Sequence, residues 1–183
     1  ADDLHPKVRS RYGLASDDLV RCVGRGQMDI TRGTHVLPVL AVLAQQNMLF
    51  PESGHDVPFT VTTIGYETAA GHEALTTSRV FEFDRRRRRF DSLTLWDDDN
   101  DRLLDFLGSD GRIVSELHPR VEAGALVVEA GRQWLRTDGR YIPLVGPMSV
   151  DVDVRDRYDE TDDQYHVLAT VEHTLTGHLM SYR

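Results

Sequence analysis

From residue 57 to the end of the chain, apolar and polar residues alternate with a period of two. In one segment three valines alternate with two aspartates: Val150, Asp151, Val152, Asp153 and Val154. Such spacing puts every second side chain on the same face, so it predicts β-strands with one face against a core and the other in water. Short polar breaks with turn residues recur about every ten residues, which indicates a meander of hairpins.

A long antiparallel meander would leave exposed edges unless the sheet curls round or closes. The sequence therefore predicts a mainly β (α+β) fold, in which an antiparallel meander is curled into a lipocalin-like barrel or wrapped sheet. The alternation is the same for a closed barrel and for an open wrapped sheet, so both remain open.

Residues 1–50 contain the helical patterns. Ser16 followed by two aspartates is typical of a helix N-cap with acids in the first turn, so we expect a short helix that ends near Gly24. Between Gly24 and Gly33 the residues alternate, which predicts a strand. Residues 34–49 are apolar nearly all round, so they predict a mostly buried helix that plugs one end of the sheet or covers an open side. One or two N-terminal helices should therefore pack on the sheet.

A chain of 183 residues is long enough for one sizeable core. We expect one domain over residues 1–183, with a helical N-terminal part (1–50) and an antiparallel sheet (57–183). No stretch reaches the roughly 18 to 20 apolar residues that a membrane span needs, and the first residues lack the layout of a signal peptide. These features predict a cytoplasmic protein that does not span a membrane.

The charged residues are mostly arginine and aspartate. Acids outnumber bases by 30 to 21, the net charge is −9, and Lys7 is the only lysine. A surplus of strongly hydrated carboxylates costs little at high salt, so this pattern predicts a halophilic protein; a GC-rich genome is the alternative explanation. Either way, an acidic chain is a poor partner for nucleic acid.

Several short motifs together carry a family resemblance. They are Gly24–Gly33, Pro51–Phe59, Arg79–Phe81, Phe90–Ser92, Tyr141–Pro147 and Gly177–Tyr182. With them the chain resembles the uncharacterised domain-of-unknown-function 4166 family over nearly its whole length. The resemblance implies a fold with a helix ending in a proline and glycine turn before a Val-Pro strand. It implies no particular activity.

Arg79 is the first candidate for a binding residue. It alternates with Phe81, so its guanidinium should share the inward face of a strand. A buried guanidinium left unpaired costs several kcal/mol, so we expect Asp105, Glu116 or an anionic ligand to meet it. Two interpretations stay open: a buried ion pair that fixes strand register, and an anchor for the carboxylate or carbonyl group of a bound molecule.

Aromatic residues on the strands are candidates for a cavity wall, although such residues more often form plain core. They are Tyr66, Trp96, Trp134, Tyr141, Tyr165 and Tyr182. Trp134 and Tyr141 flank a turn, so we expect these two side chains at the mouth of a cavity.

Other chemistries lack their motifs. There is no His-Glu-x-x-His, and His173 and His178 would face opposite sides of a single strand, so we expect no metal. Cys22, expected on or near the first helix, has no obvious base beside it, and no nucleophile elbow is present. Gly24-x-Gly26 lacks the third glycine of a dinucleotide fingerprint, so no cofactor is expected.

The run Arg85–Arg89 would be a nucleic-acid candidate on composition alone. It is bracketed by Asp84 and Asp91 and should sit at a hairpin tip, so a solvated turn is the better interpretation.

These observations predict a protein that binds a small, largely apolar molecule with a polar or acidic end inside a barrel-like cavity. The candidate ligand-binding residues are Arg79, Phe81, Asp105, Glu116, Trp134 and Tyr141. Cofactor-free chemistry of the isomerase or cyclase type stays open, as does a homo-oligomer. The alternative is a non-catalytic protein-interaction or structural module with a solid core.

Overall fold

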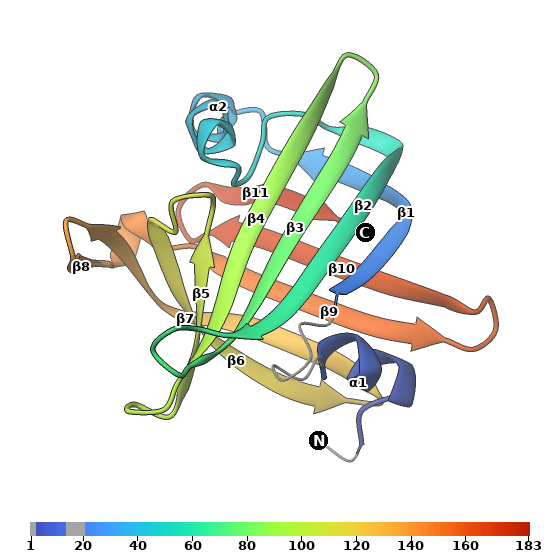
Figure 1. The fold of residues 1–183 in the computed structure, drawn as a ribbon. Coiled ribbons are helices and arrows are strands. Elements are labelled where there is room, and N and C mark those ends of the chain that lie inside the picture. The colour runs from blue at the N-terminus through green and yellow to red at the C-terminus, as the bar shows by residue number, and fades with distance from the viewer. Residues whose placement is uncertain (1–2, 14–20) are drawn as a thin grey trace.

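The computed structural model describes residues 3–13 and 21–183 (Figure 1), and this part of the chain is mostly β-sheet. Two α-helices are present, Pro6–Tyr12 (α1) and Leu37–Leu43 (α2), and two short 3-10 segments, Ala44–Gln46 (η2) and Gly146–Met148 (η3). The strands are Arg21–Arg32 (β1), Gly54–Glu67 (β2), Glu73–Phe83 (β3), Arg86–Asp97 (β4), Arg102–Leu107 (β5), Ile113–Glu122 (β6), Ala125–Thr137 (β7), Arg140–Leu144 (β8), Asp151–Asp159 (β9), Gln164–His173 (β10) and Gly177–Tyr182 (β11). None of these helices is long and apolar enough to cross a membrane.

Ten of the eleven described strands close into an antiparallel barrel, so the predicted curled meander is confirmed and the sheet is closed. The long strand β7 completes the ring. One of its edges pairs with β6, while on the other edge Leu126–Glu129 pair with β9 and Gln133–Thr137 pair with β8. Strand β8 is therefore an extra strand outside the ring.

The first and last described strands meet in a short pairing. On one edge, β1 pairs with β2 from Arg21 to Ile30, whereas on its other edge only Ile30–Arg32 are in register with β11. Two backbone hydrogen bonds between Asp29 and Arg183 extend this contact by one step. By register, with three residue pairs against four for β7–β9, the β1–β11 pairing is the shortest junction between neighbouring described strands of the ring.

Tight turns connect the hairpins of the sheet. The β7–β8 turn has Asp138 and Gly139 at φ 47° and 74°, and the β6–β7 turn has Ala123 and Gly124 at φ 48° and 82°. Two consecutive left-handed residues define the hairpin turn whose twist matches that of the strands, and Asp-Gly suits it especially well.

An apolar core packs between β1, β2, β3, β10 and β11. Phe81 lies at its centre, 1% exposed, with its ring centroid 5.0 Å from that of Phe50 and 6.0 Å from that of Phe59. Burying a phenylalanine of this kind contributes about 2 kcal/mol. Ala169 and Tyr182 belong both to this core and to the wall of the cavity described below.

One prediction for the N-terminal part was wrong, and one helix was missed. Residues 21–24, including Cys22, lie in β1 and not at the end of a helix, because pairing with β2 extends the strand back to Arg21. The start of that predicted helix, at Ser16, lies outside the described residues. Helix α1, which is only seven residues long, was not predicted. The His5 side chain caps it by accepting a hydrogen bond from the Lys7 backbone N–H.

The helix expected over residues 34–49 is shorter and less buried than predicted. Its regular part is α2, in which only Leu40 is buried, while Val39 and Val42 are exposed. The arginine run also differs from expectation: the β3–β4 turn is Asp84–Arg85, and the following arginines belong to β4. Arg88 of β4 forms a bidentate ion pair with Glu52, in which Nε and Nη2 each donate a hydrogen bond of 2.7 Å to a carboxylate oxygen.

Candidate functional site

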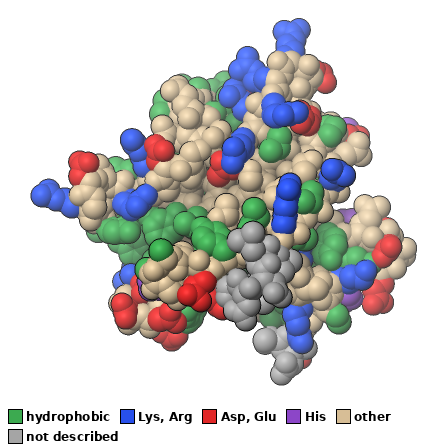
Figure 2. All heavy atoms as spheres, viewed as in Figure 1, with side chains coloured by type: hydrophobic (Ala, Val, Ile, Leu, Met, Phe, Trp, Pro, Cys, Tyr) green, Lys and Arg blue, Asp and Glu red, His purple; other side chains and the backbone are tan. Residues whose placement is uncertain are grey.

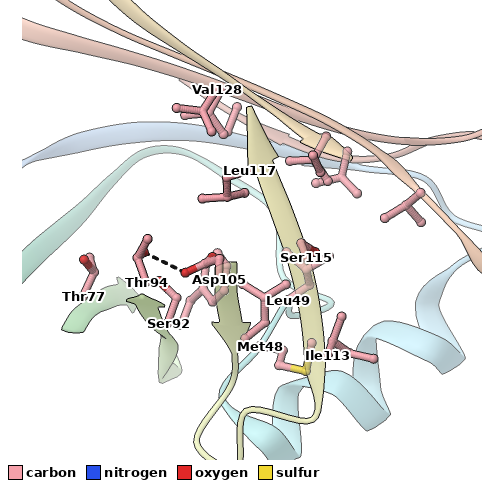
Figure 3. Close-up of a pocket in the computed structure, with 18 of the residues that line it drawn as sticks. Met48, Leu49, Thr77, Ser92, Thr94, Asp105, Ile113, Ser115, Leu117 and Val128 are labelled. Carbon is pink, nitrogen blue, oxygen red and sulfur yellow. Dashed lines mark hydrogen bonds between the residues drawn. The ribbon is translucent and has the colours of Figure 1, made fainter. Parts of the chain in front are cut away.

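The barrel encloses a cavity of about 640 Å³ (Figure 3). Alternate residues of the surrounding strands line it, as Ile113, Ser115 and Leu117 of β6 show. Most of the wall is apolar, and α2 contributes Val39 and Leu40 to it. The prediction that this helix would close part of the sheet therefore fits its position against the cavity.

A polar strip crosses the wall on three neighbouring strands, β3, β4 and β5. Thr77 lies opposite Ser92, and Thr94 lies opposite Asp105 in the strand register. Thr94 Oγ1 donates a hydrogen bond of 2.9 Å to Asp105 Oδ1 (Figure 3). Strand register therefore places a carboxylate and three hydroxyl groups together in a largely apolar interior.

Arg79 completes this strip. Its guanidinium carbon lies 4.9 Å from the ring centroid of Phe90, and Nη1 donates a long hydrogen bond of 3.5 Å to Ser92 Oγ. Among the described residues, no carboxylate forms an ion pair with Arg79. The aromatic face and one hydroxyl leave most of its donors available to a molecule in the cavity.

Asp105 is the second charged group of the strip. Burial raises the pKa of its carboxyl group above the ordinary value, while the Thr94 hydrogen bond, the charge of Arg79 and Ser92 act in the opposite direction. Arg79 is thus near enough to affect the titration of Asp105 without forming a direct ion pair. The carboxyl is disposed to accept a proton more readily than a surface aspartate does.

A buried carboxylate holds α1 against the barrel wall. Asp156 of β9 is 1% exposed, and its Oδ2 accepts a hydrogen bond from Tyr12 Oη at 2.7 Å and lies 2.9 Å from Arg11 Nη1. Its Oδ1 has no hydrogen-bond partner among the described residues. Burial raises the pKa of both Asp156 and Tyr12. Tyr12 also lines the cavity, so this contact fixes one part of the cavity wall.

Two clusters, each of two aspartates and one histidine, lie outside the cavity. Asp29, His55 and Asp56 form one, and Asp159, Asp162 and His166 form the other. In each group the histidine already pairs with a carboxylate, as in His166 Nε2 to Asp162 Oδ2 at 2.8 Å. None of these residues lines the cavity.

Comparison with known proteins gives the family. A family model described as "Domain of unknown function (DUF4166)" matches residues 4–183. The chain belongs to the DUF4166 family. The chain is also 31% identical to a Bacillus subtilis (strain 168) protein named "Uncharacterized protein YndH", with 98% of this chain and 88% of that protein aligned. No solved structure matches.

The predicted site residues occupy different places in this DUF4166 barrel. Arg79 and Asp105 both line the cavity, and Phe81 lies in the adjoining core. The other three lie away from the cavity. Glu116 pairs with Arg132 at 2.9 Å, and Tyr141 is half exposed on β8. Trp134 lies near two guanidinium groups, each 5.7 Å from its ring centroid.

A β-bulge explains the position of Trp134. In the β6–β7 register, Ser115 is opposite Gln133 but Leu117 is opposite Ala130, so β7 has an extra residue between them. The inward face of β7 therefore shifts from Ala130 to Gln133, and Trp134 turns outward. Gln133 uses its inward position to exchange two hydrogen bonds with the Val150 backbone, at 2.7 and 3.1 Å.

Several lining residues were not predicted from the sequence. Ser92 and Thr94 carry the polar strip with Thr77, and Phe90 and Tyr12 contact the two arginines described above. The alternation in β4 does contain a signal for three of them, because it places Phe90, Ser92 and Thr94 on one face. Tyr12 had no comparable signal, since α1 is too short for a helical pattern.

Proposed function

We propose that this DUF4166 barrel binds a small, largely apolar molecule with a polar or acidic end. The observation that carries the proposal is the guanidinium of Arg79, which faces a mostly apolar cavity without a carboxylate partner among the described residues. A volume of about 640 Å³ falls within the usual range of small-molecule sites. The rival interpretation, an interaction module with a solid core, gains no support from a hollow interior.

An acidic end suits the polar strip best. A ligand carboxylate could accept hydrogen bonds from Arg79 and from the hydroxyls of Ser92 and Thr77. These bonds would be charge-assisted and would form in a medium of low dielectric constant. The raised pKa of Asp105 reduces the charge repulsion that such a ligand would meet. Once protonated, the Asp105 carboxyl group would itself donate a hydrogen bond to the ligand.

Thermal unfolding with a panel of long-chain acids, isoprenoid acids and their alcohols tests the proposal. A matching ligand at 100 times its dissociation constant adds about 2.7 kcal/mol, which raises the unfolding temperature by roughly 5 to 10 °C for a domain of this size. Ala130→Trp is the matched control, because an indole in place of a lining methyl group occupies the cavity. The variant should remain folded and show no shift. If no class of compound shifts the wild-type protein, the interaction module is the better interpretation.

A second function, cofactor-free isomerisation or cyclisation of the bound molecule, is favoured by the pair of groups in the polar strip. Asp105 could take a proton from a carbon acid and return it at another position, while Arg79 stabilises the negative charge that develops in between. Both groups lie in the cavity, and the pKa of Asp105 is raised towards the range of a general base.

Asp105→Asn separates chemistry from binding. The variant should bind the ligand but no longer exchange ligand C–H hydrogens with deuterated water, as measured by mass spectrometry. It should also gain stability at pH values above the pKa of Asp105, because a buried acid with a raised pKa destabilises the fold once pH rises through that pKa. If the wild-type protein shows no exchange either, binding alone is the function.

A further inference from the structure

Apart from residues 57–66, which lie within β2, three segments of ten or more residues carry no Asp, Glu, Lys or Arg, although these residues make up 28% of the sequence. They are residues 33–51, 141–150 and 173–182. The first contains α2, the second contains η3 and most of β8, and the third contains the β10–β11 turn and β11. A solvated surface in an acidic protein normally carries charge, so three such segments call for an explanation.

The three segments meet on one side of the barrel. The Gly33 backbone N–H, just before α2, donates to the Leu179 carbonyl of β11 at 3.0 Å. His173, at the start of the β10–β11 turn, lies with Nε2 2.9 Å from the Pro147 carbonyl of η3. Figure 1 shows α2, β8 and the start of β11 on the same side, and Figure 2 shows hydrophobic side chains gathered beside β7 and β8 there.

Each of these segments exposes large apolar side chains, which we call the apolar rim. The rim consists of Val39, Val42, Val145, Met148 and Leu175, each between 59% and 71% exposed. Val39 and Met148 also line the cavity. The rim therefore borders the apolar interior of the barrel.

We infer that the apolar rim docks on the surface of a zwitterionic lipid bilayer, which has no net charge. The ligand passes between bilayer and cavity at the rim. This inference rests on the proposed function. Passage through water would cost an apolar ligand about 0.8 kcal/mol per methylene group, and direct contact of the rim with lipid removes that barrier. The rim residues project from a helix, a loop and a hairpin tip, which suits insertion among headgroups better than it suits a flat interface with a second copy.

The charges of the molecule indicate the kind of lipid. The chain has a net charge of −9, and the three segments of the rim contribute no lysine or arginine. Binding to anionic membranes depends on clusters of basic residues. Each lysine or arginine near the membrane surface contributes about 1 kcal/mol of binding energy. An acidic protein with an uncharged docking face should therefore prefer zwitterionic lipid and should bind anionic lipid less well at low salt.

Flotation with phosphatidylcholine vesicles tests this inference. The wild-type protein should float with the vesicles, and less of it should float with phosphatidylglycerol vesicles at low salt. The double variant Val42→Asp with Leu175→Asp should lower partitioning at least about tenfold, because two apolar contacts are replaced by charges. Leu168→Asp is the matched control, since Leu168 is an exposed leucine of β10 outside the rim. Circular dichroism establishes that each variant is folded.

A fluorescent polyene acid, titrated without vesicles, separates this inference from the proposed function. Val42 and Leu175 do not line the cavity, so the double variant should bind the probe as the wild-type protein does. Absence of wild-type flotation, or equal flotation of the double variant, overturns the docking. A wild-type dimer that the double variant dissociates, seen by light scattering, assigns the rim to a second copy and also overturns it. Flotation without probe binding overturns ligand passage and the proposed function together.

Discussion

Arg79→Met should weaken the binding of an apolar carboxylate by about 100-fold or more while the barrel stays folded. Losing one partner of a desolvated charge pair costs about 2 to 5 kcal/mol of binding energy. Methionine is close to arginine in length and removes a charge that has no carboxylate partner among the described residues, so the stability of the free protein should not fall. Fluorescence titration with a polyene fatty acid measures the effect.

Two controls isolate the charge of Arg79. The alcohol that corresponds to the polyene acid should bind the wild-type protein and the variant with nearly equal affinity, because neither complex contains an ion pair. Arg132→Met removes an exposed guanidinium that pairs with Glu116 outside the cavity, and it should leave acid binding unchanged. If Arg79→Met unfolds the protein, or binds the acid as tightly as before, Arg79 is structural and does not anchor the ligand.

Arg11→Met should lower the free energy of unfolding by about 3 to 5 kcal/mol at pH 7. The substitution leaves Asp156 almost completely buried with Tyr12 as its remaining side-chain partner, and an uncompensated buried charge is among the costliest defects in a fold. Urea unfolding measures the loss. Tyr12→Phe is the matched control, since it removes one hydrogen bond from the same carboxylate and should cost only about 1 to 3 kcal/mol.

The loss in Arg11→Met should depend on pH. Burial already raises the folded-state pKa of Asp156, and the missing guanidinium, whose charge lowers that pKa, would raise it further. An acid whose pKa is raised on folding destabilises the protein above that pKa, and the penalty disappears as pH falls through it. The difference between variant and wild type should therefore narrow on acidification. A difference that stays constant with pH would show that Arg11 acts through packing alone.

The sequence predicted the barrel because its alternation is regular and its turns carry the right residues. It also placed Arg79 and Asp105 on inward faces, and both line the cavity. The β-bulge in β7 has no signal in the alternation, so the face of Trp134 could not be predicted. In β6, Val114 is fully buried although it does not line the cavity, so the apolar pattern gave no clear inward face for Glu116.

Other differences come from contacts between distant parts of the chain. Residues 21–24 form a strand because β2 offers them partners, and local sequence does not contain that information. Tyr12 lines the cavity, and its hydroxyl donates a hydrogen bond to Asp156, 144 positions away in the chain. The family resemblance noted from short motifs is confirmed by the model match over residues 4–183. The halophilic character and the cytoplasmic location stay predictions.

The short junction between β1 and β11 has a consequence for how the molecule is made. Its paired residues lie about 150 positions apart in the chain, and bringing such distant segments together is slow because the entropy of the long loop must be lost first. During synthesis β1 emerges from the ribosome long before β11, which is its second neighbour in the ring. Until then one edge of β1 has unpaired backbone groups, which in a nascent chain can recruit the wrong strand.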